Sequence, residues 1–152
     1  MATTRTPQRM ARELALQALY QGFLNPDYTA SGLIVNLQET KPIIESRNGK
    51  RPAVNEDFFQ ELVKGIYAHI DRYQKALKPF LSRSWEEVDW IEKAILLIAA
   101  YELKNHLHTP TSVIIDEAVG IAKTYGKEGS YKFINGVLDL SLIHISEPTR
   151  PY

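Results

Sequence analysis

Three arginines, Arg5, Arg9 and Arg12, carry the only charged side chains among the first twelve residues. Spacings of four and three residues place them on one stripe of a helix, and Tyr20 lies near that stripe about two turns further on. Cations that hold phosphates beside a ring that can stack a base are typical of a single-stranded RNA surface. A solvated helix end accounts for the same residues equally well, so both interpretations stay open at this point.

A second group of charges is acidic and surrounds two predicted helix starts. It comprises Glu86, Glu87, Asp89 and Glu92. Because the positive end of the helix dipole favours acids at such positions, capping explains most of this cluster. The alternative is a docking surface for a basic protein partner.

The residues needed for catalysis or metal binding do not come together in the sequence. Cysteine is absent, which excludes disulfides, thiolate zinc sites, iron–sulfur clusters and cysteine nucleophiles. His106 and His108 lie two residues apart with no third ligand at metal spacing. No nucleophile, base and orienting group can be assembled. We therefore expect a non-catalytic protein without a metal or cofactor.

Composition restricts the class of protein further. The chain has 152 residues, with 18 Lys plus Arg and 18 Asp plus Glu. A zero net charge excludes a uniformly basic coat, so any contact with nucleic acid must be local. No apolar run approaches a membrane span, and the polar N-terminus lacks the apolar stretch of a signal peptide. We expect one domain in the cytoplasm.

Apolar spacing is helical almost everywhere. Helices are predicted at 6–23 and 31–39, from an N-cap at Asn55 to just before Pro79, as one turn after Ser84, from Asp89 through Leu103, at 113–125 with Gly126 as C-cap, and from about Ser130. The fold class is therefore all-α, with six or seven helices. The helix that follows Asp89 is apolar around much of its girth, so we expect it to lie at the centre.

The last residues, 140–152, do not fit the preceding domain. β-Branched residues and a proline are expected to interrupt the last helix just after Asp139. Residues 140–150 also resemble the translation of a transposase sequencing adapter. We therefore assign residues 1–139 to one RNA-binding domain and expect 140–152 to be a library artefact that contributes nothing to function.

Four ordered blocks resemble the NusB family of bacterial transcription antitermination factors. They are ARELALQALYQ at 11–21, IEKAIL at 91–96 running to AYEL at 100–103, IIDEAV at 114–119 running to AK at 122–123, and KFINGVLD at 132–139. The resemblance covers residues 9–139. It implies a compact all-helical bundle in two packed subdomains.

The resemblance also implies a function. Family members bind boxA RNA of ribosomal RNA leaders together with the ribosomal protein NusE, within an antitermination complex on RNA polymerase. A homodimer is the expected state when the protein is unbound. By position, the first-helix RNA surface corresponds to Arg9, Arg12 and Tyr20, with Arg5 on the same stripe, and a second RNA-contacting segment to Lys132, Phe133 and Asn135. Glu92, with Glu86 close by, corresponds to the surface that faces NusE.

The sequence departs from the family pattern at three positions. Gln8 and Met10 stand where relatives often carry arginine, which predicts a less basic RNA surface. Asp116 replaces the usual asparagine, and an amide donor is lost there. Asn135 and Gly136 inside a helix lower its stability, which either a binding site or close helix packing would explain.

Two other functions remain as alternatives. The same fold forms the N-terminal domain of a ribosomal-RNA cytosine methyltransferase, which would need a further catalytic domain. A protein-only adaptor, whose first helix never touches RNA, is the other. The salt dependence of RNA binding separates the adaptor classes.

Overall fold

The structure is a computed structural model that describes residues 6–40 and 53–145. Within these ranges it contains seven α-helices and two short 3₁₀ helices, with no strand. The chain divides into two helical units, residues 1–67 and residues 68–152. The all-α prediction is confirmed. Among the described residues, no helix combines the length and the apolar character that crossing a membrane requires.

The first unit contains α1 (Pro7–Leu24), α2 (Ala30–Thr40) and most of α3 (Glu56–Ala68). Two predicted N-caps form: Thr6 Oγ1 accepts a hydrogen bond from the backbone N–H of Arg9 at 3.0 Å, and Asn55 Oδ1 accepts one from Phe58 at 3.1 Å. Apolar side chains of all three helices make the core, including Leu14, Leu19, Leu33, Leu37, Phe59 and Leu62.

Helix α1 lies close to its neighbours because of a buried glycine. A Cβ on Gly22 would overlap the Tyr67 hydroxyl and would meet Leu33 Cδ1 at 3.1 Å. The Asn36 side-chain amide also donates a hydrogen bond to Gln21 Oε1 at 2.6 Å, which ties α2 to α1. Burial raises the pKa of the Tyr67 hydroxyl, in keeping with its position against this helix.

One long helix was predicted between Asn55 and Pro79, and this prediction is wrong. The chain forms α3 and then α4 (Ile70–Leu77), because His69 leaves the helical region with φ −139° and ψ 34°. The carbonyl of His69 accepts the first backbone hydrogen bonds of α4, from Arg72 at 3.0 Å and Tyr73 at 3.2 Å. Ile66 and Ile70 keep the apolar spacing across the break, so periodicity alone does not detect it.

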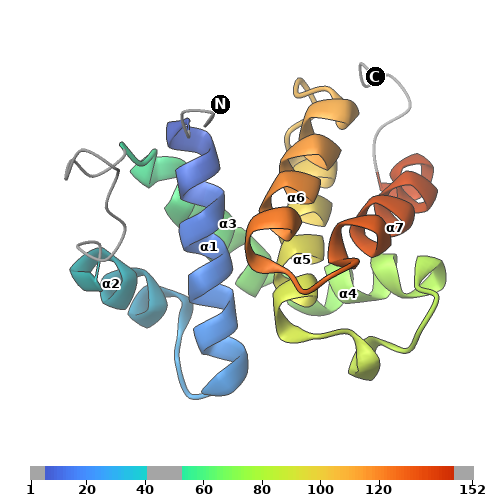
Figure 1. Cartoon of the computed structure of the whole chain (residues 1–152). Coiled ribbons are helices and arrows are strands. Elements are labelled where there is room, and N and C mark those ends of the chain that lie inside the picture. Colours follow the sequence, from blue (N-terminus) through green and yellow to red (C-terminus); the bar gives the residue numbers. More distant parts are fainter. Residues whose placement is uncertain (1–5, 41–52, 146–152) are drawn as a thin grey trace. The chain divides into compact units, whose positions relative to one another are not determined.

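The second unit also contains η2 (Lys78–Phe80), η3 (Trp85–Glu87), α5 (Trp90–Asn105), α6 (Thr111–Tyr125) and α7 (Ser130–Ile145). The last three helices lie side by side (Figure 1). An unbroken run of α5, from Glu92 to Leu103, is buried, which confirms its predicted central place.

The two predicted helix starts at Ser84 and Asp89 both form, with different caps. The Asp89 box forms: Asp89 Oδ1 accepts from the Glu92 N–H at 2.8 Å, and Glu92 Oε1 accepts from the Asp89 N–H at 3.4 Å. The single turn predicted after Ser84 also forms, as η3, although the Ser84 side chain makes no capping hydrogen bond. Gly126 ends α6 as predicted.

Helix α7 does not stop after Asp139 as predicted, but continues to Ile145. Ser141 and Ile145 are buried, and the His144 ring stacks on Phe80 with centroids 5.2 Å apart. Packing of this turn outweighs the weak helix propensity of its residues. Residues 146–152 lie outside the described ranges. That 140–152 are foreign to the native chain stays a prediction.

Candidate nucleic-acid interface

The predicted arginines of the first helix differ in their exposure to solvent. Arg9 is half-buried, but Arg12 is only 6% exposed, and its guanidinium carbon lies 5.1 Å from the centre of the Phe58 ring. A cation held against a ring inside the unit serves packing. Arg12 is therefore not the exposed surface cation that a contact to phosphate leads one to expect. Tyr20 is half-buried, and Arg5 lies outside the described residues.

The exposure of Gln8, Met10 and Asp116 shows how much each departure from the family pattern changes the surface. Met10 is fully buried, so it removes no cation from the surface of this unit. Gln8 is exposed and does leave α1 less basic there. Asp116 is exposed on α6, where water can solvate its carboxylate.

The predicted segment at the start of α7 offers a mixed surface. Lys132 and Asn135 are exposed, whereas Phe133 is half-buried. The Nζ atoms of Lys132 and Lys123 lie 5.9 and 5.1 Å from the centre of the Tyr131 ring. The sequence did not single out Lys123 and Tyr131, because they lie on different helices and no local pattern connects them. Two cations beside a ring suit an RNA strand.

Arg83 is the other residue that the sequence did not single out. Its guanidinium carbon lies 3.9 Å from the centre of the Phe133 ring, within stacking distance. Phe133 is therefore half-buried partly because the Arg83 guanidinium covers its ring. One of its faces carries a cation.

Gly136 has no packing role. A Cβ at this position would meet nothing within 4 Å, so the close-packing explanation for this glycine is wrong. We expect Gly136→Ala to raise the free energy of unfolding by up to about 1 kcal/mol, because alanine loses less backbone freedom in a helix interior. Urea denaturation measures the change. A stability equal to or below that of the parent would contradict the open space seen here.

The two predicted partner-binding acids have different environments. Glu86 is exposed on η3, whereas Glu92 is fully buried at the start of α5. Glu92 Oε2 accepts a hydrogen bond from the Ser130 hydroxyl at 2.8 Å, and Oε1 forms an ion pair with Arg83 Nη1 at 3.4 Å. The expectation that Glu92 is an exposed docking residue is therefore wrong, because its carboxylate is occupied inside the unit.

An aromatic cluster stands beside Glu86. The Lys93 Nζ lies 4.3 Å from the centre of a Trp90 ring system and 5.3 Å from that of Trp85. Burial lowers the pKa of Lys93, and the nearby Glu86 carboxylate opposes that shift. Trp90 remains 42% exposed, so an apolar ring accompanies the acids at this surface.

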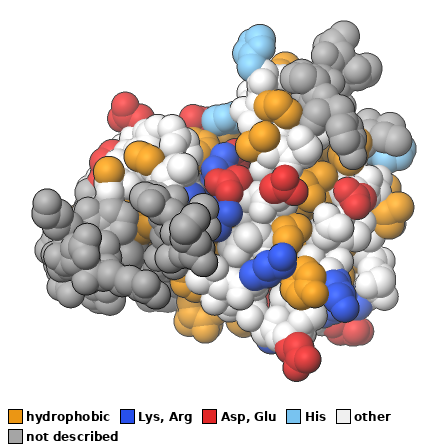
Figure 2. Space-filling model, turned by 45° about the horizontal axis from the view of Figure 1, so that its top comes forward, with side chains coloured by type: hydrophobic (Ala, Val, Ile, Leu, Met, Phe, Trp, Pro, Cys, Tyr) orange, Lys and Arg blue, Asp and Glu red, His pale blue; other side chains and the backbone are white. Residues whose placement is uncertain are grey.

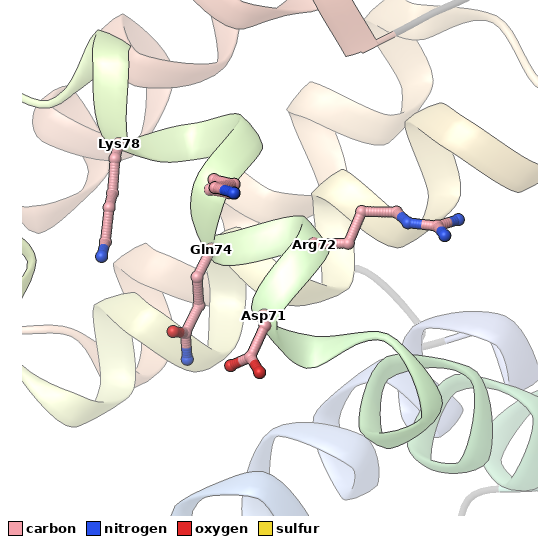
Figure 3. Close-up of a pocket in the computed structure, with 5 residues that line it drawn as sticks. Asp71, Arg72, Gln74 and Lys78 are labelled. Atoms are coloured by element: carbon pink, nitrogen blue, oxygen red, sulfur yellow. The ribbon is translucent and has the colours of Figure 1, made fainter.

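A hollow lies on the surface of the second unit. It is lined by residues of α4 and η2: Asp71, Arg72, Gln74, Lys75 and Lys78. Figure 3 shows Gln74 and Lys78 projecting to one side while Arg72 points away. In residues 6–40 and 53–145 there is no group of three His, Asp or Glu side chains arranged to hold a metal ion.

Charges of both signs lie close together on the face that Figure 2 shows. Figure 2 shows lysine or arginine side chains next to acidic ones on the face in view, in keeping with the zero net charge. RNA contacts on such a surface depend on a few positions, which is why the environment of each cation matters.

Comparison with known proteins identifies the family. The model of the NusB family matches residues 9–142. The transcription antitermination protein NusB of Mannheimia succiniciproducens is 42% identical over 136 residues, 88% of this chain and 87% of the relative. That of Idiomarina loihiensis is 38% identical over 143 residues, 94% and 96% of the two chains.

Solved structures agree in fold. NusB of T. maritima superposes with a TM-score of 0.77 at 27% identity, covering 94% of this chain and 95% of that one. A structure of antitermination factors NusB and NusE in complex with double-stranded RNA gives 0.75 at 22% identity, covering 91% and 97%. With the family model matching most of the sequence, the chain belongs to the NusB family.

Proposed function

We propose that this chain is a non-catalytic RNA-binding adaptor in transcription antitermination, which binds boxA-type single-stranded RNA together with NusE in the cytoplasm. Family membership supports the process, and a related fold is known in complex with NusE and RNA. The observation that carries RNA binding is the surface at the start of α7, where exposed Lys132 and Asn135 flank Phe133. Assembly with RNA polymerase and a homodimer in the unbound state belong to the same proposal.

The proposed binding surface for the protein partner is the exposed part of the acidic cluster. Glu86 and Glu87 are exposed on η3, and Trp90 adds an exposed aromatic ring. An aromatic residue surrounded by charges is a common composition for a protein interface. We therefore propose that a basic surface of NusE contacts η3, with Glu86 as the acid and Glu92 excluded from direct contact by its burial.

Binding of a boxA-type RNA oligonucleotide, measured with and without NusE over a range of salt concentrations, tests the proposed function. We expect Arg9→Ala and Lys132→Ala each to weaken binding and to flatten the plot of log affinity against log salt by about 0.7, the value for one contact on a single strand. A parental slope in both variants would mean that RNA binds at other residues, and a parent protein that binds no RNA would favour the protein-only adaptor.

Charge reversal tests the partner surface. We expect Glu86→Lys to lower the affinity for NusE and the association rate, because the variant repels a basic partner. Its melting temperature should stay close to that of the parent, since the side chain is exposed. Asp116→Lys, the same reversal at an exposed position on α6, is the matched control. Equal loss of NusE binding in both variants would contradict a specific contact at Glu86.

A further inference from the structure

We propose that Arg83 and Phe133 form one stacking platform for an unpaired RNA base, and that the buried Glu92 positions the guanidinium on it. This inference rests on the RNA-binding function proposed above. It adds Arg83 to the residues that contact RNA and gives Glu92 a role other than binding a protein.

The position of Arg83 is fixed from two sides. Its guanidinium carbon lies 3.9 Å from the centre of the Phe133 ring, and its Nη1 lies 3.4 Å from Glu92 Oε1. The first contact places the cation over the ring, and the second sets the direction of the side chain. A long, flexible side chain held by two contacts has little freedom left to lose when a ligand binds.

Glu92 is itself held in place. Its carboxylate accepts hydrogen bonds from the backbone N–H of Asp89 at 3.4 Å and from the Ser130 hydroxyl at 2.8 Å. Ser130 begins α7, the helix that also carries Phe133. The acid therefore joins the start of α5, the start of α7 and Arg83, so the parts of the platform share one support.

The remaining surface of Arg83 is available to a ligand. Its side chain is 30% exposed, whereas that of Glu92 is fully buried. A guanidinium has five N–H donors and a flat face, and unpaired RNA bases stack on such faces as they do on aromatic rings. Since the guanidinium already covers one face of Phe133, a base that approaches that face meets Arg83 first.

The ion pair determines which kind of contact Arg83 makes. Its charge is already balanced by Glu92, so binding a phosphate there would release fewer counterions than binding at an unpaired cation. Stacking needs the flat surface rather than the net charge. We therefore assign Arg83 to a base and the exposed Lys132 to a phosphate, two roles that salt dependence separates.

The decisive variant is Arg83→Lys, which keeps the charge and removes the flat surface. We expect about tenfold weaker binding of a boxA-type RNA oligonucleotide with an unchanged salt slope, because stacking one base contributes on the order of a factor of ten. Arg72→Lys, the same substitution at an exposed arginine of α4, should bind as the parent does. Thermal melting of each variant separates binding effects from unfolding.

A direct readout of stacking uses a set of RNA oligonucleotides, each with 2-aminopurine at one position. The parent should quench the fluorescence at one position, and Arg83→Lys should restore it. Phe133→Leu should also restore it. The double variant should bind only slightly more weakly than either single one, because both residues act as one platform.

Glu92→Gln tests the positioning role. We expect weaker quenching together with a salt slope steeper by about 0.7, because an Arg83 released from its ion pair can meet a phosphate. A purely structural role for Glu92 would not steepen the slope. Arg83→Lys at parental affinity and quenching would overturn this inference alone, whereas a parent protein that does not bind the RNA would overturn the proposed function and this inference with it.

Discussion

Replacing Glu92 by lysine is expected to lower the free energy of unfolding by about 3 kcal/mol or more. The variant would place a second cation beside Arg83 in a buried position, and breaking a buried ion pair by changing one partner typically has an effect of this size. It would also remove the acceptor for the Ser130 hydroxyl and half of the Asp89 capping box. If Glu92 lay exposed on the surface that faces NusE, the same reversal would leave the melting temperature nearly unchanged.

Urea denaturation followed by circular dichroism measures this effect as a lower midpoint at constant slope. Glu86→Lys is the matched control, because it makes the same reversal on the adjacent turn at an exposed position. A Glu92→Lys protein that unfolds at the parental midpoint and loses only NusE binding would show that Glu92 reaches the partner, against the burial described here.

The helices were predictable because their apolar spacing and end residues are local properties of the sequence. The Asp89 capping box, the Gly126 end of α6 and the central place of α5 all followed from neighbouring residues. The break at His69 did not, because one non-helical residue leaves the apolar spacing intact. The continuation of α7 to Ile145 depends on burial of Ser141 and Ile145, which local propensity does not include.

The site was less predictable because it depends on contacts between residues far apart in the chain. Spacing predicted that the arginines lie on one stripe of the first helix, but it could not show that Arg12 is buried against Phe58. The acid at position 92 was recognised as part of a cap, but its sequence neighbours could not show that it is buried and binds Arg83 and Ser130. Resemblance to a family shows which residue corresponds to a known site, but only the structure shows whether its side chain is exposed.

Arg12→Ala is the variant in which this difference matters most. We expect it to lower the free energy of unfolding by about 2 kcal/mol, because it removes a desolvated cation from the Phe58 ring and leaves space where the side chain packed. The salt slope of RNA binding should stay at the parental value, since a side chain that is 6% exposed offers little surface to a phosphate.

Lys132→Ala should have the opposite effects, because the Lys132 side chain is exposed. That variant should keep the parental stability and flatten the salt slope, so the two substitutions together separate packing from phosphate binding. Urea denaturation and RNA titrations at several salt concentrations measure both quantities on each protein. If Arg12→Ala flattened the slope and unfolded at the parental midpoint, the arginine stripe of α1 would be an RNA surface after all, and the contact with Phe58 would have to open when RNA binds.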